Sequence, residues 1–283
     1  MIAEAARTAT STDGTRIGYR TVGAGEALIV VGGALRTAED YMPLADALSR
    51  EFEVHVMDRR GRPASGPHGS DYSIEKECED LDAVIAQTGA TRVFGHSYGG
   101  LVALETGKRN TAIDQIVAYE PGVSVRGSIP SGWIPEYRRR LDKGDRRGAF
   151  AALVRGSGHA PAIVSRLPLR YLDLVLRIAI KQEQWRRMDA LLEANLAENE
   201  EVRRLDSTVA TYAEVSARVL LLGGSKSPAA SRVPLDALHH VIPDAHLELI
   251  DGVAHNAPDE GAPERVAERV ARFLAEADPP GTR

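Results

Sequence analysis

The sequence predicts an α/β protein built on a doubly wound, mostly parallel β-sheet. Two observations lead to this fold class. Apolar runs of strand length recur along the chain, and several are apolar at nearly every position, as expected of parallel strands that are buried on both faces. Helical patterns separate these runs, and strands that alternate with helices favour a parallel sheet covered by helices.

The elements follow one another in a regular order. After the N-terminal region, the predicted strands are Ala27–Val31, Phe52–Met57, Thr91–Phe94, Gln115–Tyr119, Arg218–Leu222 and His246–Ile250. The predicted helices are Ala38–Ser49, Ile74–Gln87, Tyr98–Arg109, Ser231–Val241 and Ala262–Ala277. Near the N-terminus, two short strand patterns, 7–12 and 16–21, flank Asp13-Gly14, which predicts a β-hairpin.

One long segment, residues 122–213, departs from this alternation. Its patterns are helical, with no convincing strand. We therefore expect residues 1–121 and 214–277 to form the core, residues 122–213 to form a helical lid over the sheet edge, and residues 278–283 to be a frayed tail. The segment is rich in arginine, and we interpret these arginines as a solvated helix surface. The carboxylates expected to balance them are Glu193, Glu198, Glu200 and Glu201.

Composition limits the classes of function. The chain has 283 residues, 43% of them hydrophobic, which is enough for one large domain with an insertion. A net charge of -5 gives no general reason to bind nucleic acid or an anionic membrane. The first residues resemble no signal peptide, and no apolar run approaches the ~20 residues of a membrane span. We expect a soluble, cytoplasmic protein that acts on a small molecule, with an oligomeric state that the sequence does not define.

The stretch VFGHSYGG places Ser97 between two glycines, Gly95 and Gly99. The predicted strand Thr91–Phe94 runs directly into it, and a helical pattern begins at Tyr98. This is G-x-S-x-G in a strand–turn–helix context, in which a sharp turn presents the serine hydroxyl at the carboxyl end of the sheet. The helix N-terminus behind the serine favours developing negative charge. The context predicts that Ser97 is a nucleophile.

With these residues the sequence resembles the α/β-hydrolase superfamily over most of the chain outside the insertion. The resemblance implies the α/β-hydrolase fold, with the helical lid inserted after the strand that ends near Tyr119. Residues 58–66, DRRGRPASG, are similar to the family's D-x-R-G-x-G-x-S segment, except that Pro63 stands where glycine is usual. That segment is structural in the family, so the departure concerns the shape of a loop.

The resemblance also implies an oxyanion hole. Residues 30–34, VVGGA, are similar to the family's apolar strand followed by His-Gly, with Gly32 in place of the histidine. The backbone N–H groups of Ala34 and Tyr98 would then be the two donors.

A serine hydroxyl needs a general base, and His255 is the best candidate among eight histidines. It follows the last predicted strand and precedes the C-terminal helix, where the family keeps its catalytic histidine. His96 adjoins Ser97, but the turn should point its side chain away. His239 and His240 are expected on a helix surface, and His159 lies in the insertion.

The acid is less well defined. The family most often carries an aspartate after the strand that here is Arg218–Leu222, but GGSKSP at that place has no carboxylate. Some family members, haloalkane dehalogenases among them, carry the acid at the end of the preceding strand, where this chain has Glu120. A carboxylate buried there would need a partner, and an imidazole N–H is suitable. We predict Glu120. The alternatives are Asp251, or a dyad in which a serine of GGSKSP, Ser225 or Ser227, orients the histidine.

A Ser97–His255–Glu120 triad predicts acyl transfer through an acyl-enzyme. The sequence contains no Walker-type loop, no G-x-G-x-x-G opening a helix and no cluster of metal ligands, so we expect neither cofactor nor metal. We predict a serine hydrolase of a small-to-medium carboxylic ester or lactone, with a thioester as a further option. The alternatives are a non-hydrolytic enzyme on the same scaffold (a lyase, a haloperoxidase-like enzyme or a cyclase) and a ligand-binding receptor.

Large apolar residues of the insertion are candidates for the substrate pocket. Trp133, Tyr137 and Trp185 are the ones we select. The sequence indicates no exposed apolar surface element, which argues against long-chain lipid at a water interface as the substrate.

Overall fold

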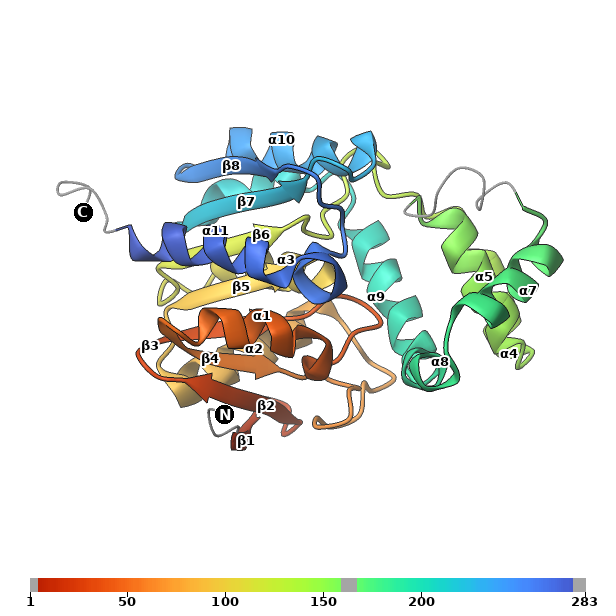
Figure 1. The fold of residues 1–283 in the computed structure, drawn as a ribbon, viewed down its shortest axis with the longest axis horizontal. Helices are drawn as coiled ribbons and strands as arrows, with labels where there is room; N and C mark the ends of the chain where they lie inside the picture. The colour runs from red at the N-terminus through yellow and green to blue at the C-terminus, as the bar shows by residue number, and fades with distance from the viewer. Residues whose placement is uncertain (1–4, 159–166, 277–283) are drawn as a thin grey trace.

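The computed structural model describes residues 5–158 and 167–276 and contains one eight-stranded sheet in the order β1-β2-β4-β3-β5-β6-β7-β8 (Figure 1). The strands are β1 Ala5–Thr10, β2 Arg16–Gly23, β3 Glu26–Val31, β4 Phe52–Met57, β5 Arg92–His96, β6 Gln115–Tyr119, β7 Arg218–Gly224 and β8 Ala245–Ile250. The first two pairings are antiparallel and the other five are parallel. The predicted doubly wound, mostly parallel sheet is confirmed.

Helices cover both faces of the sheet. α1 Met42–Leu48 and α11 Pro263–Ala275 pack on one face, and α2 Ile74–Thr88, α3 Tyr98–Gly107 and α10 Arg232–Val241 pack on the other (Figure 1). Successive residues of β6 show the arrangement, since Val117 contacts the first group and Ile116 the second. This is why the parallel strands are continuously apolar in sequence. The predicted helix Ala38–Ser49 begins with a 3-10 turn, η1 Ala38–Tyr41, before α1.

Between β6 and β7, the described residues form helices and no strand. They are α4 Ile134–Asp142, α5 Arg146–Gly156, α7 Leu169–Ala179, α8 Gln182–Asp189, α9 Leu192–Arg204 and the short η2 Val209–Glu214. Figure 1 shows this insertion beside the carboxyl ends of the parallel strands, with α9 nearest the sheet. The insertion has an apolar core of its own. The predicted frayed tail and His159 lie outside the described residues.

Glu198 on α9 does not lie on a solvated surface, as we expected, but is fully buried. Its Oε1 forms ion pairs with Arg59 at 3.0 Å and Arg62 at 2.6 Å, and both arginines belong to the DRRGRPASG loop. One turn further on, Glu201 accepts a hydrogen bond from the backbone N–H of Ile74 at the start of α2. The helix period could not reveal these partners, because they come from distant loops. α9 is therefore fixed to the core by buried charges.

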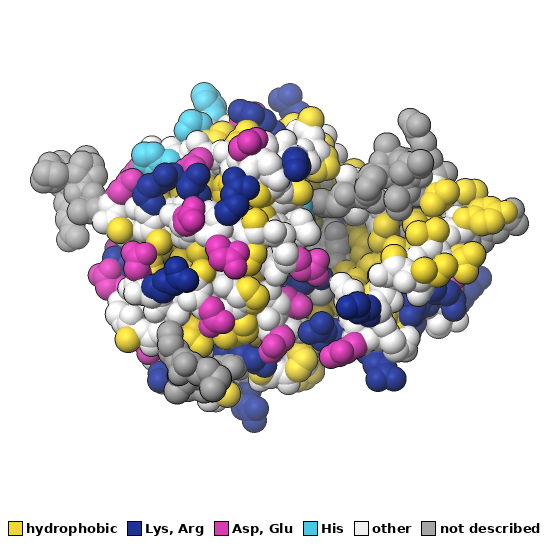
Figure 2. All heavy atoms as spheres, viewed as in Figure 1, with side chains coloured by type: hydrophobic (Ala, Val, Ile, Leu, Met, Phe, Trp, Pro, Cys, Tyr) yellow, Lys and Arg dark blue, Asp and Glu magenta, His cyan; other side chains and the backbone are white. Residues whose placement is uncertain are grey.

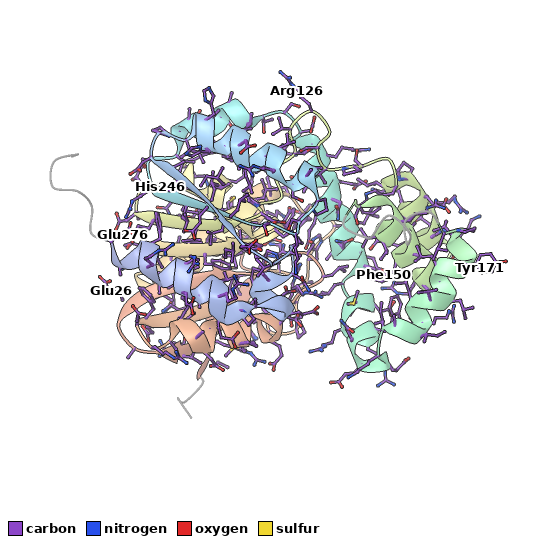
Figure 3. The ribbon with its side chains drawn as sticks, turned by 45° about the horizontal axis from the view of Figure 1, so that its top comes forward. Glu26, Arg126, Phe150, Tyr171, His246 and Glu276 are labelled. Carbon is purple, nitrogen blue, oxygen red and sulfur yellow. The ribbon has the colours of Figure 1, made fainter. Side chains whose placement is uncertain are left out.

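α7 presents an apolar face that we did not expect. Its exposed large side chains are Tyr171, Leu174, Val175 and Ile178, the last of them 80% accessible. Figure 2 shows hydrophobic side chains gathered on the insertion, and Figure 3 places Tyr171 at its far edge. The expectation that no apolar element is exposed is wrong, because sequence pattern alone does not show whether an apolar helix face is covered. Among the described residues, no helix is long and apolar enough to span a membrane.

Candidate active site

Ser97 occupies a strained turn between β5 and α3. Its backbone has φ 53° and ψ -119°, a combination that costs a side-chain-bearing residue about 1–3 kcal/mol. Hydrogen bonds hold the turn: Ser97 N–H donates to the Tyr119 carbonyl (3.0 Å), and Gly122 N–H donates to the Ser97 carbonyl (2.8 Å). A Cβ on Gly99 would lie 2.2 Å from the Val31 carbonyl oxygen, so the second glycine of the motif is required by close approach.

The loop after β3 lies against this turn. A Cβ on Gly33 would come within 3.2 Å of the Ser97 Cβ, which shows how closely the two segments approach. Gly33 N–H donates to the Tyr41 hydroxyl at 2.8 Å. Ala34 and Tyr98 both line the cavity in which Ser97 lies, and neither of their N–H groups donates to another described residue. These two N–H groups are therefore available to an oxyanion.

Glu120 and His255 contact each other at the same edge of the sheet. His255 Nδ1 lies 2.8 Å from Glu120 Oε2. Glu120 directly follows β6, has φ 40° and is only 5% exposed. Its other oxygen, Oε1, accepts hydrogen bonds from Gly224 N–H (2.8 Å) and from the Ser227 hydroxyl (2.5 Å). Four neighbouring strands, β5 to β8, thus bring the serine, the carboxylate, its donors and the histidine together.

These contacts keep the Glu120 carboxylate charged. Burial by itself raises the pKa of this carboxyl, but the hydrogen bond and charge of His255, together with the Gly224 and Ser227 donors, outweigh burial and hold the pKa below its ordinary value. A carboxylate that accepts the Nδ1–H of an imidazole fixes the tautomer in which Nε2 can accept a proton.

The other acids considered from the sequence have different partners. Asp251 is exposed and accepts a hydrogen bond from Ser225 at 2.9 Å. Ser227 donates to Glu120, as described above. The geometry therefore favours Glu120 as the partner of His255.

A hydrogen-bonded chain that we did not predict connects the loop after β3 with the loop of His255. The Tyr41 hydroxyl, which accepts from Gly33 N–H, lies 2.7 Å from His96 Nδ1, and His96 Nε2 lies 2.9 Å from the His255 carbonyl oxygen. The three contacts are consistent if His96 carries its proton on Nε2. Gly33 N–H then donates to the Tyr41 hydroxyl, this hydroxyl donates to His96 Nδ1, and His96 Nε2–H donates to the His255 carbonyl. His96 is thus used to position two loops, and its place next to Ser97 was the only sequence signal.

Arg59 is a second residue whose role the sequence did not define. Its guanidinium donates to the carbonyls of Gly32 (3.0 Å) and Gly33 (3.1 Å), which immediately precede Ala34. It also pairs with Glu77 at 2.7 Å and with Glu198, and lies 4.8 Å from the centre of the Tyr98 ring. Its position in the DRRGRPASG segment was the available signal. Arg59 therefore fixes the backbone of the loop after β3 through two hydrogen bonds.

Two cavities meet at Ser97. The first, which we call the proline cavity, has a volume of about 130 Å³ and is walled largely by Pro121, Ile129, Pro130, Val202, Pro228 and Pro234. The second, which we call the asparagine cavity, has a volume of about 290 Å³ and is walled by polar residues (Arg36, Asn195, Asn199, Asn256 and Asp259) and by apolar ones that include Phe150 and Met188. Ser97, His255 and Ala34 line both cavities. A substrate bound at Ser97 therefore has separate room for two substituents.

The aromatic residues selected from the sequence do not line either cavity. Trp133, Tyr137 and Trp185 are buried in the apolar core of the insertion, and the Tyr137 hydroxyl donates to the Leu192 carbonyl at 3.0 Å. We correct their assignment from substrate contact to packing of the insertion. Phe150, which lies on the side of the insertion that faces the core (Figure 3), lines the asparagine cavity instead. The described residues contain no cluster of side chains able to hold a metal ion.

Comparison with known proteins identifies the family. The model of the "Alpha/beta hydrolase family" matches residues 28–269, and the chain belongs to this family. It is 27% identical over 270 residues to a pimeloyl-[acyl-carrier protein] methyl ester esterase of Xanthomonas campestris, covering 90% of this chain and 97% of that one. It is 32% identical over 123 residues to an N-formylmaleamate deformylase of Pseudomonas putida, covering 41% of this chain but only 46% of the deformylase. A solved α/β hydrolase of Sphaerobacter thermophilus is similar with a TM-score of 0.79 and 28% identity, over 95% of this chain and 100% of that one.

Proposed function

We propose that this α/β hydrolase is a serine hydrolase in which Ser97, His255 and Glu120 form the catalytic triad. The observation that carries the proposal is the 2.8 Å contact between His255 Nδ1 and a buried, fully hydrogen-bonded Glu120, beside a serine held on a strained turn. A histidine with a purely structural role would not require a buried carboxylate partner that accepts three hydrogen bonds. The arrangement fits a base that must carry a positive charge during the reaction.

The proposed reaction is acyl transfer to water. Ser97 Oγ attacks the carbonyl carbon while His255 Nε2 takes the hydroxyl proton, and the N–H groups of Ala34 and Tyr98 stabilise the oxyanion. The intermediate collapses to an acyl-enzyme as His255 gives its proton to the leaving alcohol. Water, deprotonated by His255, then attacks the acyl-enzyme and releases the acid and Ser97. Glu120 stays ionised and stabilises the imidazolium at each stage.

The proposed substrate is a small-to-medium carboxylic ester or lactone. The two cavities, of about 130 and 290 Å³, have room for one compact apolar group and one somewhat larger group. Among the relatives, the esterase acts by its name on a methyl ester and the deformylase on an N-formyl group. Both names describe hydrolysis of an acyl compound, which agrees with the proposed chemistry. We further propose that residues 122–213 act as a lid, since α9 and α5 supply walls of the cavities.

The test is covalent labelling of the nucleophile. Intact-mass spectrometry after treatment with a fluorophosphonate is expected to show one adduct on the wild type and none on Ser97→Ala. Ser225→Ala is a matched control. Ser225 donates a hydrogen bond to Asp251 at the surface, so this substitution should leave the adduct unchanged. An unlabelled wild-type protein that is folded and binds small esters would instead favour the non-hydrolytic enzyme or the receptor.

A further inference from the structure

Two residues that line the asparagine cavity each have a buried side-chain oxygen without a hydrogen-bond partner among the described residues. Asn195 is 2% exposed and lies on the face of α9 that also carries Asn199, one turn further on. Asn199 donates from its side chain to the Asn195 carbonyl at 2.8 Å. The Asn195 side chain, in contrast, makes no hydrogen bond with any described residue, and its Oδ1 is wholly buried. Burying such a group without a partner is costly, and it is uncommon in native proteins.

A second buried oxygen of the same kind lies in the wall of the same cavity. Asp259 belongs to the turn Ala257–Gly261 that follows His255, and it is 6% exposed. Its Oδ2 accepts a hydrogen bond from Arg36 Nε. Its Oδ1 is buried and has no partner among the described residues. Unlike an asparagine amide, a carboxylate offers an acceptor in either orientation, so this vacant acceptor does not depend on how an amide is assigned.

The two groups define what the cavity can bind. Both Asn195 Oδ1 and Asp259 Oδ1 are acceptors, so they are complementary to a group that donates hydrogen bonds. Arg36 pairs with Asp259 and lies 3.2 Å from Glu260, so its charge is already matched and is not offered to a carboxylate. A substrate carboxylate would meet Asp259 as a like charge.

We propose that the asparagine cavity binds the end of the substrate that carries a neutral hydrogen-bond donor, a primary amide or a hydroxyl, with Asn195 and Asp259 as its acceptors. This proposal rests on the proposed function and adds the substrate class: an ester or lactone with a polar donor on one side of the scissile bond. The proline cavity, whose walls are largely apolar, holds the other side.

The experiment measures binding without turnover. In Ser97→Ala protein, three esters of the same length are titrated by NMR: methyl adipamate, with a terminal primary amide, methyl 6-oxoheptanoate, with a methyl ketone at the same place, and monomethyl adipate, with a carboxylate. We expect the amide to bind about tenfold more tightly than the ketone, the difference that one additional hydrogen bond to a buried acceptor supports, and the carboxylate to bind least.

Variants of Asn195 show whether the cavity causes this preference. In the Ser97→Ala background, Asn195→Leu should reduce the preference for the amide to about threefold or less, while Asn195→Asp, which keeps an acceptor, should retain it. If Asn195→Leu does not fold, as judged by thermal unfolding, Asn195→Ala makes the same test with a smaller side chain. Equal affinity for amide and ketone, no saturable binding of the amide, or an unchanged preference in Asn195→Leu would overturn the proposal.

This design separates the proposal from the function on which it rests. If wild-type protein hydrolyses none of the three esters although the Ser97→Ala protein prefers the amide, the proposed activity fails and the binding assignment holds. If wild-type protein hydrolyses the amide and the ketone equally well and Ser97→Ala binds them equally well, the hydrolase stands and the assignment of the cavity fails.

Discussion

Glu120 and Asp259 are two buried carboxylates that line the two cavities at Ser97, and their hydrogen-bond partners differ. All the hydrogen bonds that Glu120 needs come from the protein, through His255, Gly224 and Ser227. Asp259 has one oxygen paired with Arg36, and its other oxygen has no partner in the described part of the chain. The pKa of Glu120 is accordingly lowered, whereas burial raises the pKa of Asp259 above its ordinary value despite the charge of Arg36.

The difference indicates which groups act on the reaction and which act on the ligand. A carboxylate that the protein satisfies completely is rigid and ionised before substrate arrives, as a partner for imidazolium must be. An acceptor that is left open gains its partner only when a ligand binds. On α9, Glu198 Oε1 is paired with two arginines, whereas Glu198 Oε2 and Asn195 Oδ1 have no hydrogen-bond partner among the described residues.

The largest expected effect comes from removing the charge of Glu120. Glu120→Gln should lower kcat/KM by about 10⁴, because the amide disfavours the required tautomer and no longer stabilises imidazolium. Asp259→Asn should lower it by only about tenfold, through weaker binding. Steady-state kinetics on the best ester found, with circular dichroism to verify folding, make the measurement. Near-wild-type turnover in Glu120→Gln would remove Glu120 from the triad and return attention to Asp251 or a dyad.

On α9 the comparison predicts opposite changes in stability. Glu198→Gln should lower the free energy of unfolding by about 3 kcal/mol, because it removes the negative charge that balances the buried Arg59 and Arg62. Asn195→Leu should raise the free energy of unfolding by about 1 kcal/mol, because an unpaired amide is replaced by an apolar side chain of similar shape. Urea denaturation of both variants provides the values. A loss of stability in Asn195→Leu would mean that the amide has a partner in solution.

A smaller effect is expected from the serines of the loop after β7. Ser227→Ala removes one of the two donors to Glu120 Oε1 and leaves Gly224 N–H in place, which should cost about 1.5 kcal/mol in transition-state stabilisation, or about tenfold in kcat/KM. Ser225→Ala, two residues away, removes only exposed hydrogen bonds, one donated to Asp251 and one accepted from Gly252 N–H, and is the matched control. Equal kinetics in the two variants would show that the Ser227 hydroxyl does not support Glu120.

The smallest effect is a pH dependence of stability with opposite signs at the two carboxylates. The pKa of Glu120 in the folded protein is lowered from its ordinary value of 4.5. Its ionised carboxylate therefore stabilises the folded state fully above pH 4.5, and this stabilisation is lost as the pH falls through the folded pKa. Because the folded pKa of Asp259 is raised above 3.8, its ionisation costs stability at neutral pH, and this cost is relieved as the pH falls through the folded pKa.

The variants separate these two contributions. Glu120→Gln should therefore lose stability relative to the wild type at neutral pH and lose less in acid, and Asp259→Asn should gain stability at neutral pH and gain less in acid. Thermal unfolding from pH 7 to about pH 3 would reveal the two trends, because the contribution of Glu120 is lost only below pH 4.5. Parallel trends in the two variants would contradict the contrast.

The sequence alone determined the sheet and the residues along its carboxyl edge. Ser97, Glu120 and His255 each follow a strand whose apolar run is evident, and parallel strands necessarily end at the same edge. The G-x-S-x-G spacing indicated a nucleophile because a predicted strand precedes it and a predicted helix follows it. Local pattern and topology were therefore sufficient to propose which side chains meet, and the 2.8 Å contact of His255 with Glu120 agrees with that proposal.

Only the tertiary structure decided how the insertion meets the core. Trp133, Tyr137 and Trp185 share a helical apolar pattern with Phe150, yet only Phe150 lines a cavity at Ser97. Glu198 and Glu200 lie two residues apart on α9, but Glu198 is buried against the core and Glu200 pairs with Arg138 at the surface. The helix period fixes which residues share a face, whereas the neighbour of that face is set by packing between segments that are distant in sequence.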